Sequence, residues 1–145
     1  MANIKNMKMA EALLANEKIE FSKSFFGLCT TATYKPTGSR LKGYQNEYSL
    51  DVTWAIKSII GATPGKLSEE TAKTSAITPS PNGPIRLDIC MTDDQSFAAI
   101  QMLRFEDFDY QPTSEVRTFE GEDVKALAKI LFRNSDNHRT TMTNE

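Results

Sequence analysis

The sequence predicts an α+β fold that combines a twisted antiparallel β-sheet with a C-terminal amphipathic helix and an N-terminal helix. Residues 44–57 alternate apolar and polar side chains, which is typical of a strand with one buried face. Residues 85–91 and 97–105 form two further strand-like runs, separated by a polar turn. Residues 121–133 then repeat apolar side chains at helical spacing. Strands followed by a single well-marked helix indicate the α+β class.

The composition is that of an ordinary globular domain. The chain has 145 residues, of which 39% are apolar and 25% charged, and this length is sufficient for one domain with a sizeable core. No apolar run approaches the roughly 20 residues that a membrane span needs. The N-terminus also lacks the apolar centre of a signal peptide. We therefore expect a cytoplasmic protein without a membrane partner.

Three segments are expected along the chain. Residues 1–20 form an N-terminal helix or arm, because apolar side chains recur every three or four residues over 4–19. Residues 21–134 form a single α+β domain. Within it, the proline- and glycine-rich stretch 61–84 is a long surface connection. Residues 135–145 are polar and are expected to be disordered.

A long β-hairpin is expected in the first half of the domain. Residues 21–35 are rich in threonine and aromatic side chains, which favour an extended backbone. The next residues, 35–43, contain Pro36, Gly38 and three cations without an acid, so they predict a basic turn. Residues 44–57 then complete the hairpin as its second strand.

The aromatic side chains of this hairpin divide into two groups. Tyr48 and Trp54 share the parity of Leu50 and the other apolar residues of 44–57, which places them in the core. Tyr34 and Tyr44 flank the basic turn and are the better candidates for exposure.

The second half of the chain is expected to form the framework of the domain. Strand 97–105 is apolar on both faces and is therefore central in the sheet, beside strand 85–91. A turn at 111–114 leads to a short strand over 115–119. The helix over 121–133 starts with acidic residues, which complement the positive end of the helix dipole.

No catalytic signature is present in the sequence. The only histidine, His138, lies in the polar tail, and Cys29 and Cys90 lie in apolar segments without the spacing of metal ligands. Phosphate-binding glycine motifs and nucleophile elbows are absent. We therefore expect a protein that is no enzyme and uses no metal or cofactor.

Two acidic clusters leave one alternative open. Asp93 and Asp94 form one cluster, and Glu106, Asp107 and Asp109 form the other. Carboxylates of this kind bind Mg²⁺ in nuclease sites. Both clusters fall at strand ends, however, where solvated turn acids are the simpler interpretation.

Charge is distributed unevenly along the chain. Residues 1–66 carry nine Lys/Arg and five Asp/Glu, whereas residues 67–145 carry eight and fourteen. The basic half is able to face a polyanion through cations that contact phosphates and tyrosines that stack on bases. The candidate nucleic-acid-binding residues are Lys23, Tyr34, Lys35, Arg40, Lys42, Tyr44 and Lys57.

The order of the elements resembles the Whirly group of single-stranded-DNA-binding proteins. The residues that carry the resemblance are the hairpin Phe25–Ile56, the strands Ile85–Met91 and Phe97–Phe105, and the ending Val116–Leu131. The match is one of topology, since the Lys-Gly-Lys signature of that group is absent. The resemblance implies a homodimer or larger homo-oligomer packed through the helix, with DNA on the sheets.

Two functions remain open from the sequence. The first is a non-catalytic protein that binds single-stranded DNA or RNA through the basic hairpin and a sheet face. The second is a structural, assembly or adaptor protein, for example a phage particle component, with no affinity for nucleic acid. The net charge of −2 and the absence of catalytic motifs favour this alternative.

Overall fold

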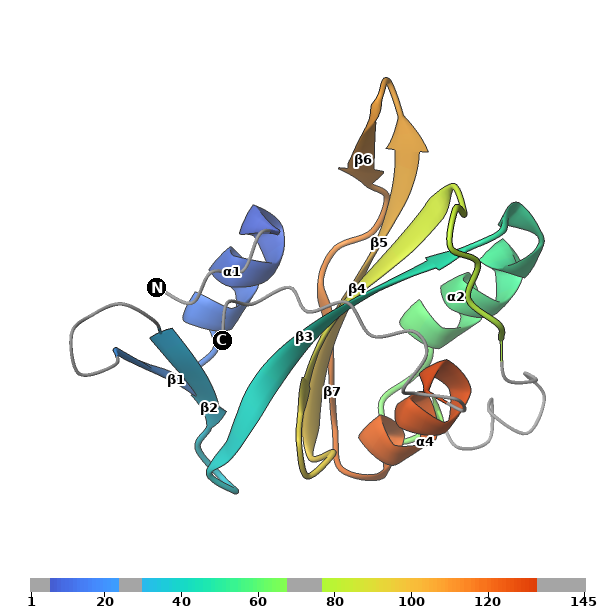
Figure 1. Cartoon of the computed structure of the whole chain (residues 1–145). Coiled ribbons are helices and arrows are strands. Elements are labelled where there is room, and N and C mark those ends of the chain that lie inside the picture. Colours follow the sequence, from blue (N-terminus) through green and yellow to red (C-terminus); the bar gives the residue numbers. More distant parts are fainter. Residues whose placement is uncertain (1–5, 24–29, 68–76, 133–145) are drawn as a thin grey trace.

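The computed structural model describes residues 6–23, 30–67 and 77–132. Within these ranges, seven strands form an antiparallel sheet with helices on both faces (Figure 1), which confirms the α+β class. The strands are β1 (Ile19–Lys23), β2 (Thr30–Tyr34), β3 (Ser39–Tyr48), β4 (Ile85–Thr92), β5 (Phe97–Glu106), β6 (Asp109–Pro112) and β7 (Arg117–Glu120). The helices are α1 (Met7–Leu14), the 3₁₀ turn η1 (Leu50–Val52), α2 (Thr53–Ile60) and α4 (Glu122–Leu131).

Strand β5 is an interior strand, paired along both edges, as its apolar residues on both faces predict. The strand order is β1-β2-β3-β4-β5-β6, and β7 also pairs with β5. The first half of β5 pairs with β7, where Phe97 faces Glu120, and the second half pairs with β6, where Glu106 faces Asp109. The two short strands β6 and β7 therefore pair with successive parts of the same edge of β5.

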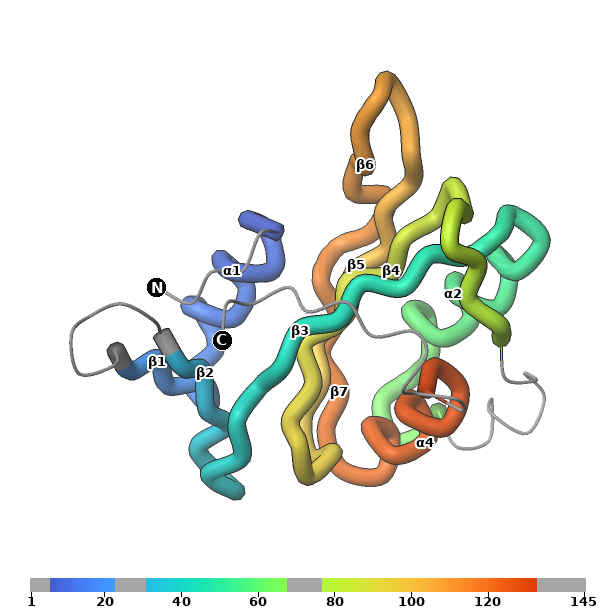
Figure 2. The backbone as a smooth tube through the Cα atoms, in the orientation of Figure 1, coloured from blue at the N-terminus to red at the C-terminus, as the bar shows by residue number. Residues whose placement is uncertain are grey.

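The sheet has a hydrophobic core on each face. Helices α2 and α4 cover one face, and α1 covers part of the other (Figures 1 and 2). The larger core joins the two helices to β4 and β5 through Ile56, Ile59, Ile85, Leu87, Ile89, Ile100, Leu127 and Leu131. The smaller core joins α1 to the opposite face through Met9, Leu13, Tyr34, Leu41, Cys90, Phe97 and Ala99.

Beyond α1, the second face of the sheet carries polar side chains in place of a helix. The register aligns Gln45 with Asp88 and Asp88 with Gln101, so that neighbouring strands present these side chains on the same side. In the next row, Glu47 faces Arg86. Asp88 and Gln101 are buried, whereas Gln45 and Arg86 line the pocket that we describe below.

The prediction of a strand over 44–57 is wrong beyond Tyr48. The chain turns there into η1 and α2, and Trp54 and Leu50 lie on the surface with exposed fractions of 60% and 50%. The strand stops because its partner stops: Tyr48 pairs with Ile85, the first residue of β4. Later residues would therefore have no ladder partner on β4. The expected burial of Tyr48 is confirmed.

Two predictions at the N-terminus also need correction. The helix expected over 4–19 is α1, which ends at Leu14, and β1 starts at Ile19. The strand expected over 21–35 is an antiparallel pair, β1 and β2, in which Phe21 faces Ala32.

The described ends of the 61–84 connection are anchored to the core. Leu67 and Ile77 are both buried there. The buried carboxylate of Asp123, in the first turn of α4, accepts hydrogen bonds from the amides of Gly65 (2.7 Å) and Leu67 (3.2 Å). The acid thus satisfies loop amides in addition to complementing the helix dipole.

Some predictions concern residues that lie outside the described ranges: His138, Cys29, the expected disorder of 135–145 and the end of the last helix beyond Phe132. Among the described helices, none is long and apolar enough to cross a membrane.

Candidate interaction surface

Strands β5 and β6 extend beyond the rest of the sheet as a projecting hairpin (Figure 1). We call residues 103–112 the finger, because Leu103 to Glu106 pair with Asp109 to Pro112. Two residues, Asp107 and Phe108, connect the strands, and their φ angles are 52° and 67°. Two positive φ angles in a two-residue loop define a type I′ turn, which matches the twist of the strands.

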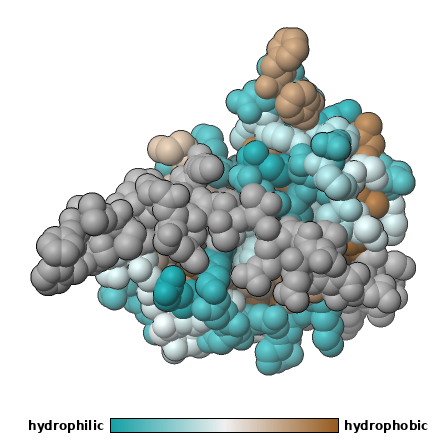
Figure 3. Space-filling model, in the orientation of Figure 1, coloured by the Kyte–Doolittle hydropathy of each residue, from teal (hydrophilic) through white to brown (hydrophobic). Residues whose placement is uncertain are grey.

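Phe108 is an unusual residue for this turn. The second position of a type I′ turn strongly favours glycine, because a side chain in the left-handed region crowds the backbone. Phe108 nevertheless occupies it, and its side chain is 96% exposed. In the space-filling view, apolar atoms lie at the tip of the projecting hairpin (Figure 3). The finger thus holds an aromatic ring in solvent at a strained position.

The base of the finger is fixed by Tyr110. Its ring meets the ring of Phe105, directly opposite on β5, edge-on at 5.3 Å between centroids. The guanidinium of Arg86 lies over the Tyr110 ring, 4.6 Å from the ring centroid. The Tyr110 hydroxyl lies 2.8 Å from each of two acceptors, the carboxylate of Glu47 and the carbonyl of Gly83, which share its single proton. Burial, and then the bond to Glu47, raise the pKa of Tyr110 to about 12.

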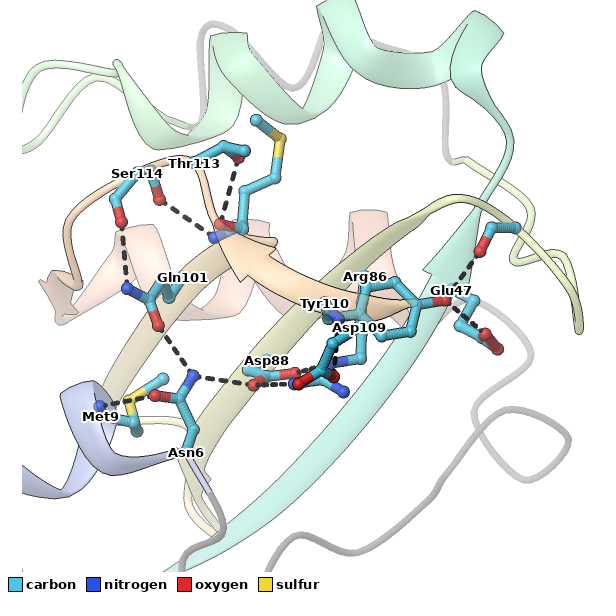
Figure 4. Close-up of polar contacts among 12 residues, drawn as sticks. Asn6, Met9, Glu47, Arg86, Asp88, Gln101, Asp109, Tyr110, Thr113 and Ser114 are labelled. Carbon is cyan, nitrogen blue, oxygen red and sulfur yellow. Dashed lines mark hydrogen bonds and ion pairs between the residues drawn. The ribbon is translucent and has the colours of Figure 1, made fainter. Parts of the chain in front are cut away.

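A buried polar network continues from Arg86 across the sheet (Figure 4). Arg86 donates two hydrogen bonds to the fully buried carboxylate of Asp88, at 2.7 and 3.0 Å. The side-chain amide of Asn6 donates to Asp88 at 2.8 Å and to Gln101 at 2.7 Å. The same Asn6 side chain caps α1 by accepting from the amide of Met9. The start of α1 is therefore tied to the strands that carry the finger.

The segment after the finger is held by side chains that replace ladder bonds. The Met102 amide donates to the hydroxyl of Ser114 at 3.0 Å, and the side chain of Gln101 donates to the carbonyl of Ser114 at 3.0 Å. The amide of Thr113 donates to the carbonyl of Met102. These contacts lead the chain from β6 to β7 along the same edge of β5.

A cavity of about 420 Å³ lies between the base of the finger and the start of α1. Met7, Leu103 and Pro112 give it an apolar wall. Lys8 and Arg86 contribute positive charge to the same cavity, and Asp109 contributes a carboxylate. We call it the finger-base pocket. Its mixed lining is typical of sites in which polar groups orient an apolar ligand group.

Replacing Phe108 by glycine is expected to raise the free energy of unfolding by about 1 kcal/mol, because glycine adopts positive φ without strain. The ring is 96% exposed, so its removal forfeits little burial. The corresponding rise in melting temperature is about 3 °C. Thermal and urea denaturation measure the effect.

The control is Phe108→Ala, which removes the ring but keeps a Cβ at the strained position. It is expected to leave the stability near that of the wild type. Equal stability of the glycine and alanine variants would show that the turn stores no strain.

The expected exposure of Tyr34 is wrong, and Tyr44 is only partly exposed. Tyr34 is 6% exposed, and its ring stacks on that of Phe97 with 5.0 Å between the centroids. Its hydroxyl donates a hydrogen bond to the carboxylate of Glu120. Tyr44 packs against Phe132 at 4.9 Å between centroids, beside the larger core. Both rings point to interior partners, because alternate residues of β2 and β3 face the two cores.

The basic turn is shorter than expected and is accompanied by acids from another part of the chain. Only residues 35–38 form the turn, since β3 starts at Ser39. The Asp93 amide donates to the carbonyl of Arg40 at 3.1 Å, and the Asp93 carboxylate lies 3.5 Å from the Lys42 ammonium. Lys35 and Arg40 are exposed. The neighbouring β4–β5 turn thus offsets part of the positive charge.

The remaining candidate residues are dispersed over the surface. Lys57 is exposed on α2, one turn after Trp54. Lys23 is the last residue of β1, where its backbone pairs with Thr30. Lys35, Arg40 and Lys42 thus belong to the β2–β3 hairpin, whereas Lys57 lies on a separate helix.

The two acidic clusters considered for Mg²⁺ lie at opposite ends of β5. Asp93 and Asp94 precede this strand, whereas Glu106 and Asp107 end it. A strand of ten residues is roughly 30 Å long, so the clusters belong to separate turns. Across the described part of the chain, no group of three or more histidine, cysteine or acidic side chains is arranged to hold a metal ion.

The Asp94 carboxylate makes the stability of the fold depend on pH. Hydrogen bonds from Ser96, then from Thr37 and Thr92, lower its pKa from 3.8 to about 2. A carboxylate with a lowered pKa stabilises the folded state above its unfolded pKa, and this contribution is lost as the pH falls through its folded pKa. We expect Asp94→Asn to flatten the dependence of unfolding free energy on pH between about 4 and 2. Urea denaturation at a series of pH values checks this, and an unchanged slope would contradict it.

The finger was missed in the sequence because its turn lacks the usual glycine. The signal available was Phe105 and Tyr110, two aromatics separated by a short acidic stretch, which suits a cross-strand pair. An Asp-Gly or Asn-Gly pair between them would have marked the hairpin. Because Asp107 and Phe108 occupy these positions, the sequence pattern over 105–110 is typical of the polar end of a single strand.

No protein-family model, curated protein or solved structure matches this chain. The resemblance to the Whirly group therefore stays a hypothesis.

Proposed function

We propose that this protein is a non-catalytic assembly or adaptor module that docks a protein partner through its finger. The observation that carries the proposal is Phe108, whose ring is 96% exposed at a turn position that disfavours it. Strained residues of this kind persist where the surrounding structure enforces them, and they cluster at functional sites. Aromatic rings on rigid supports are also the usual anchors of protein interfaces.

The rigidity of the finger supports the proposal. Tyr110 and Arg86 fix its base through the ring contact and the hydrogen bonds to Glu47 and Gly83. A ring that is already held in position loses little conformational entropy when it binds. The finger is thus pre-organised to insert Phe108 into a partner.

The charge of the finger favours a protein partner over a polyanion. Glu106, Asp107 and Asp109 surround the tip, and Arg104 is the single cation, 3.9 Å from the Glu106 carboxylate. Three carboxylates repel phosphate groups and attract a surface with lysine or arginine at its rim. The partner is therefore expected to offer an apolar pocket with a basic rim.

Site-specific photocrosslinking tests the proposed function. We expect p-benzoylphenylalanine in place of Phe108 to yield discrete crosslinked protein adducts in the native cell. The matched control carries the same group in place of Lys125, which is exposed on α4, and is expected to yield none. If position 108 gives no more adducts than position 125, the finger is not a docking element.

A single-stranded nucleic-acid binder remains the second candidate, supported by a separate observation. Trp54 is 60% exposed on α2, with the exposed Lys57 one turn away, and this pair offers a stacking ring and a cation. Trp54 is the only tryptophan of the chain. This candidate predicts salt-dependent quenching of Trp54 fluorescence by oligo-dT, which Lys57→Glu weakens. Unchanged fluorescence at low salt would eliminate it.

A further inference from the structure

We infer that the partner of the finger is a second copy of this chain, and that Phe108 of each copy occupies the finger-base pocket of the other. The inference rests on the proposed function and names the partner. Finger and pocket lie side by side on one chain, since Leu103, Tyr110 and Pro112 belong to both. Two such surfaces are self-complementary, as a two-fold symmetric dimer requires.

The apolar part of the pocket suits an aromatic ring. Leu103 and Pro112 form the wall, and Met7 lies at the mouth with 62% of its side chain exposed. A methionine in this place adapts its shape to an incoming ring and makes favourable sulfur–aromatic contacts. The volume of about 420 Å³ falls within the range of pockets that enclose organic groups, roughly 300–1,000 Å³.

The charge on the α1 side of the pocket complements that of the finger, whereas Asp109 adds a carboxylate on the finger side and Arg86 is paired with Asp88. Lys8 is exposed in the first turn of α1, a turn that contains no acidic residue. The positive end of the helix dipole and the Lys8 ammonium therefore add up at the mouth, where an acid would be the favourable neighbour. Glu106 and Asp107, beside Phe108 on the finger, supply such acids from the second copy.

The polar network couples the two halves of this interface. Asn6 starts α1 and donates to Asp88, which in turn binds Arg86 beneath Tyr110. The mouth of the pocket and the base of the finger are thus held in one fixed geometry. Fixed relative placement is what allows both contacts of a reciprocal dimer to form at once.

Sedimentation equilibrium from micromolar to near-millimolar concentration tests the inference. We expect a reversible dimer that weakens as salt is raised, since charges at the rim are screened. Phe108→Ala is expected to raise the dissociation constant on the order of 30-fold, as the loss of a central aromatic anchor does. Phe108→Gly is expected to weaken the dimer equally although it stabilises the fold, which separates the interface effect from folding.

A pocket variant provides the complementary test. Met7→Glu combined with Lys8→Glu places two acids at the mouth, at exposed positions where a helix start tolerates them. We expect a loss of dimer comparable to that of Phe108→Ala. Lys57→Glu on α2 is the charge control and is expected to leave the dissociation constant unchanged.

Crosslinking of an equal mixture of ¹⁴N- and ¹⁵N-labelled protein identifies the contact. With p-benzoylphenylalanine in place of Phe108, the adduct is expected to join two copies and to include the peptide around Met7. A chain that stays monomeric at every concentration overturns the inference, as do open filaments, which lack reciprocal contacts. If the purified chain is monomeric but position 108 crosslinks a different protein in cells, the proposed function stands and the second copy is excluded.

Discussion

Replacing Asp88 by alanine is expected to lower the free energy of unfolding by about 3 kcal/mol, the lower end of the cost of breaking a buried ion pair. Asp88 is fully buried, and it accepts from Arg86 and from the Asn6 amide. Its removal leaves these donors without their acceptor in a site that water reaches poorly. Arg86 keeps a side-chain exposure of 20% and its position over Tyr110, which limits the loss. Urea denaturation measures the change.

The effect is expected to reach the finger. Asp88 holds Arg86, and Arg86 supports the ring of Tyr110, so the amides of β5 and β6 near the tip should exchange with solvent faster in Asp88→Ala. The control is Asp107→Asn, which removes an exposed acid and keeps a residue that tolerates positive φ; it is expected to change stability by less than about 0.5 kcal/mol. A loss below about 1 kcal/mol for Asp88→Ala would show that the network contributes little to the fold.

Replacing Gly83 by alanine is expected to lower the free energy of unfolding by about 3 kcal/mol, the upper end of typical overpacking effects. A Cβ atom at this position would lie less than 3.0 Å from three backbone atoms of Tyr48. Tyr48 is the last residue of β3 and is itself fully buried, so neither segment has room to move aside. The clash separates the 80–84 segment from the end of the strand.

Two hydrogen bonds are expected to be lost with that separation. The amide of Ser80 donates to the carbonyl of Glu47 at 2.7 Å, and the carbonyl of Gly83 accepts from Tyr110. Asn82→Ala is the control, since Asn82 is exposed next to Gly83, and it is expected to be nearly neutral. Chemical denaturation measures the free energy of unfolding of both variants. If Gly83→Ala is as stable as Asn82→Ala, the contact between the 80–84 segment and the end of β3 does not contribute to stability.

Sequence periodicity predicted well the segments in which apolar side chains repeat at one fixed spacing. Strands β4 and β5 and helix α4 lie within a few residues of their predicted bounds. In each, a run of apolar side chains at fixed spacing faces one large core, so that the local pattern and the tertiary environment agree. The sequence likewise predicted the acidic start of α4, but it did not predict the hydrogen bonds that Asp123 accepts from the 65–67 loop.

The stretch after Tyr48 shows where such patterns fail. Leu50, Val52, Trp54 and Ile56 alternate as in a strand, but Val52, Ala55, Ile56 and Ile59 also fit one face of a helix. The choice between the two depends on whether a neighbouring strand is available. Because β4 begins opposite Tyr48, the helix forms, and Trp54 becomes a surface residue.

The charge and the exposure of the candidate site residues depend on contacts between segments that are distant in the sequence. The turn at 35–38 has only cations nearby in the sequence, yet Asp93 lies beside Lys42 in space. Tyr34 stands next to a basic turn in the chain but donates to Glu120 across the fold. Charge and exposure are sums over neighbours in three dimensions, which local sequence does not contain.

Hydrophobic spacing within single segments specifies which side is buried, so the amino-acid sequence alone predicts the α+β class, the interior position of β5 and the helix that closes the larger core. The fold is needed to show where β3 ends, which charges are offset and that Phe108 is exposed at the tip of the finger. These features arise from the register of β3 with β4 and from the Arg86–Asp88–Asn6 network, in which Asn6 and Asp88 are 82 positions apart in the chain. The working surface that we propose is therefore a product of the fold, built from residues that are unremarkable in the linear chain.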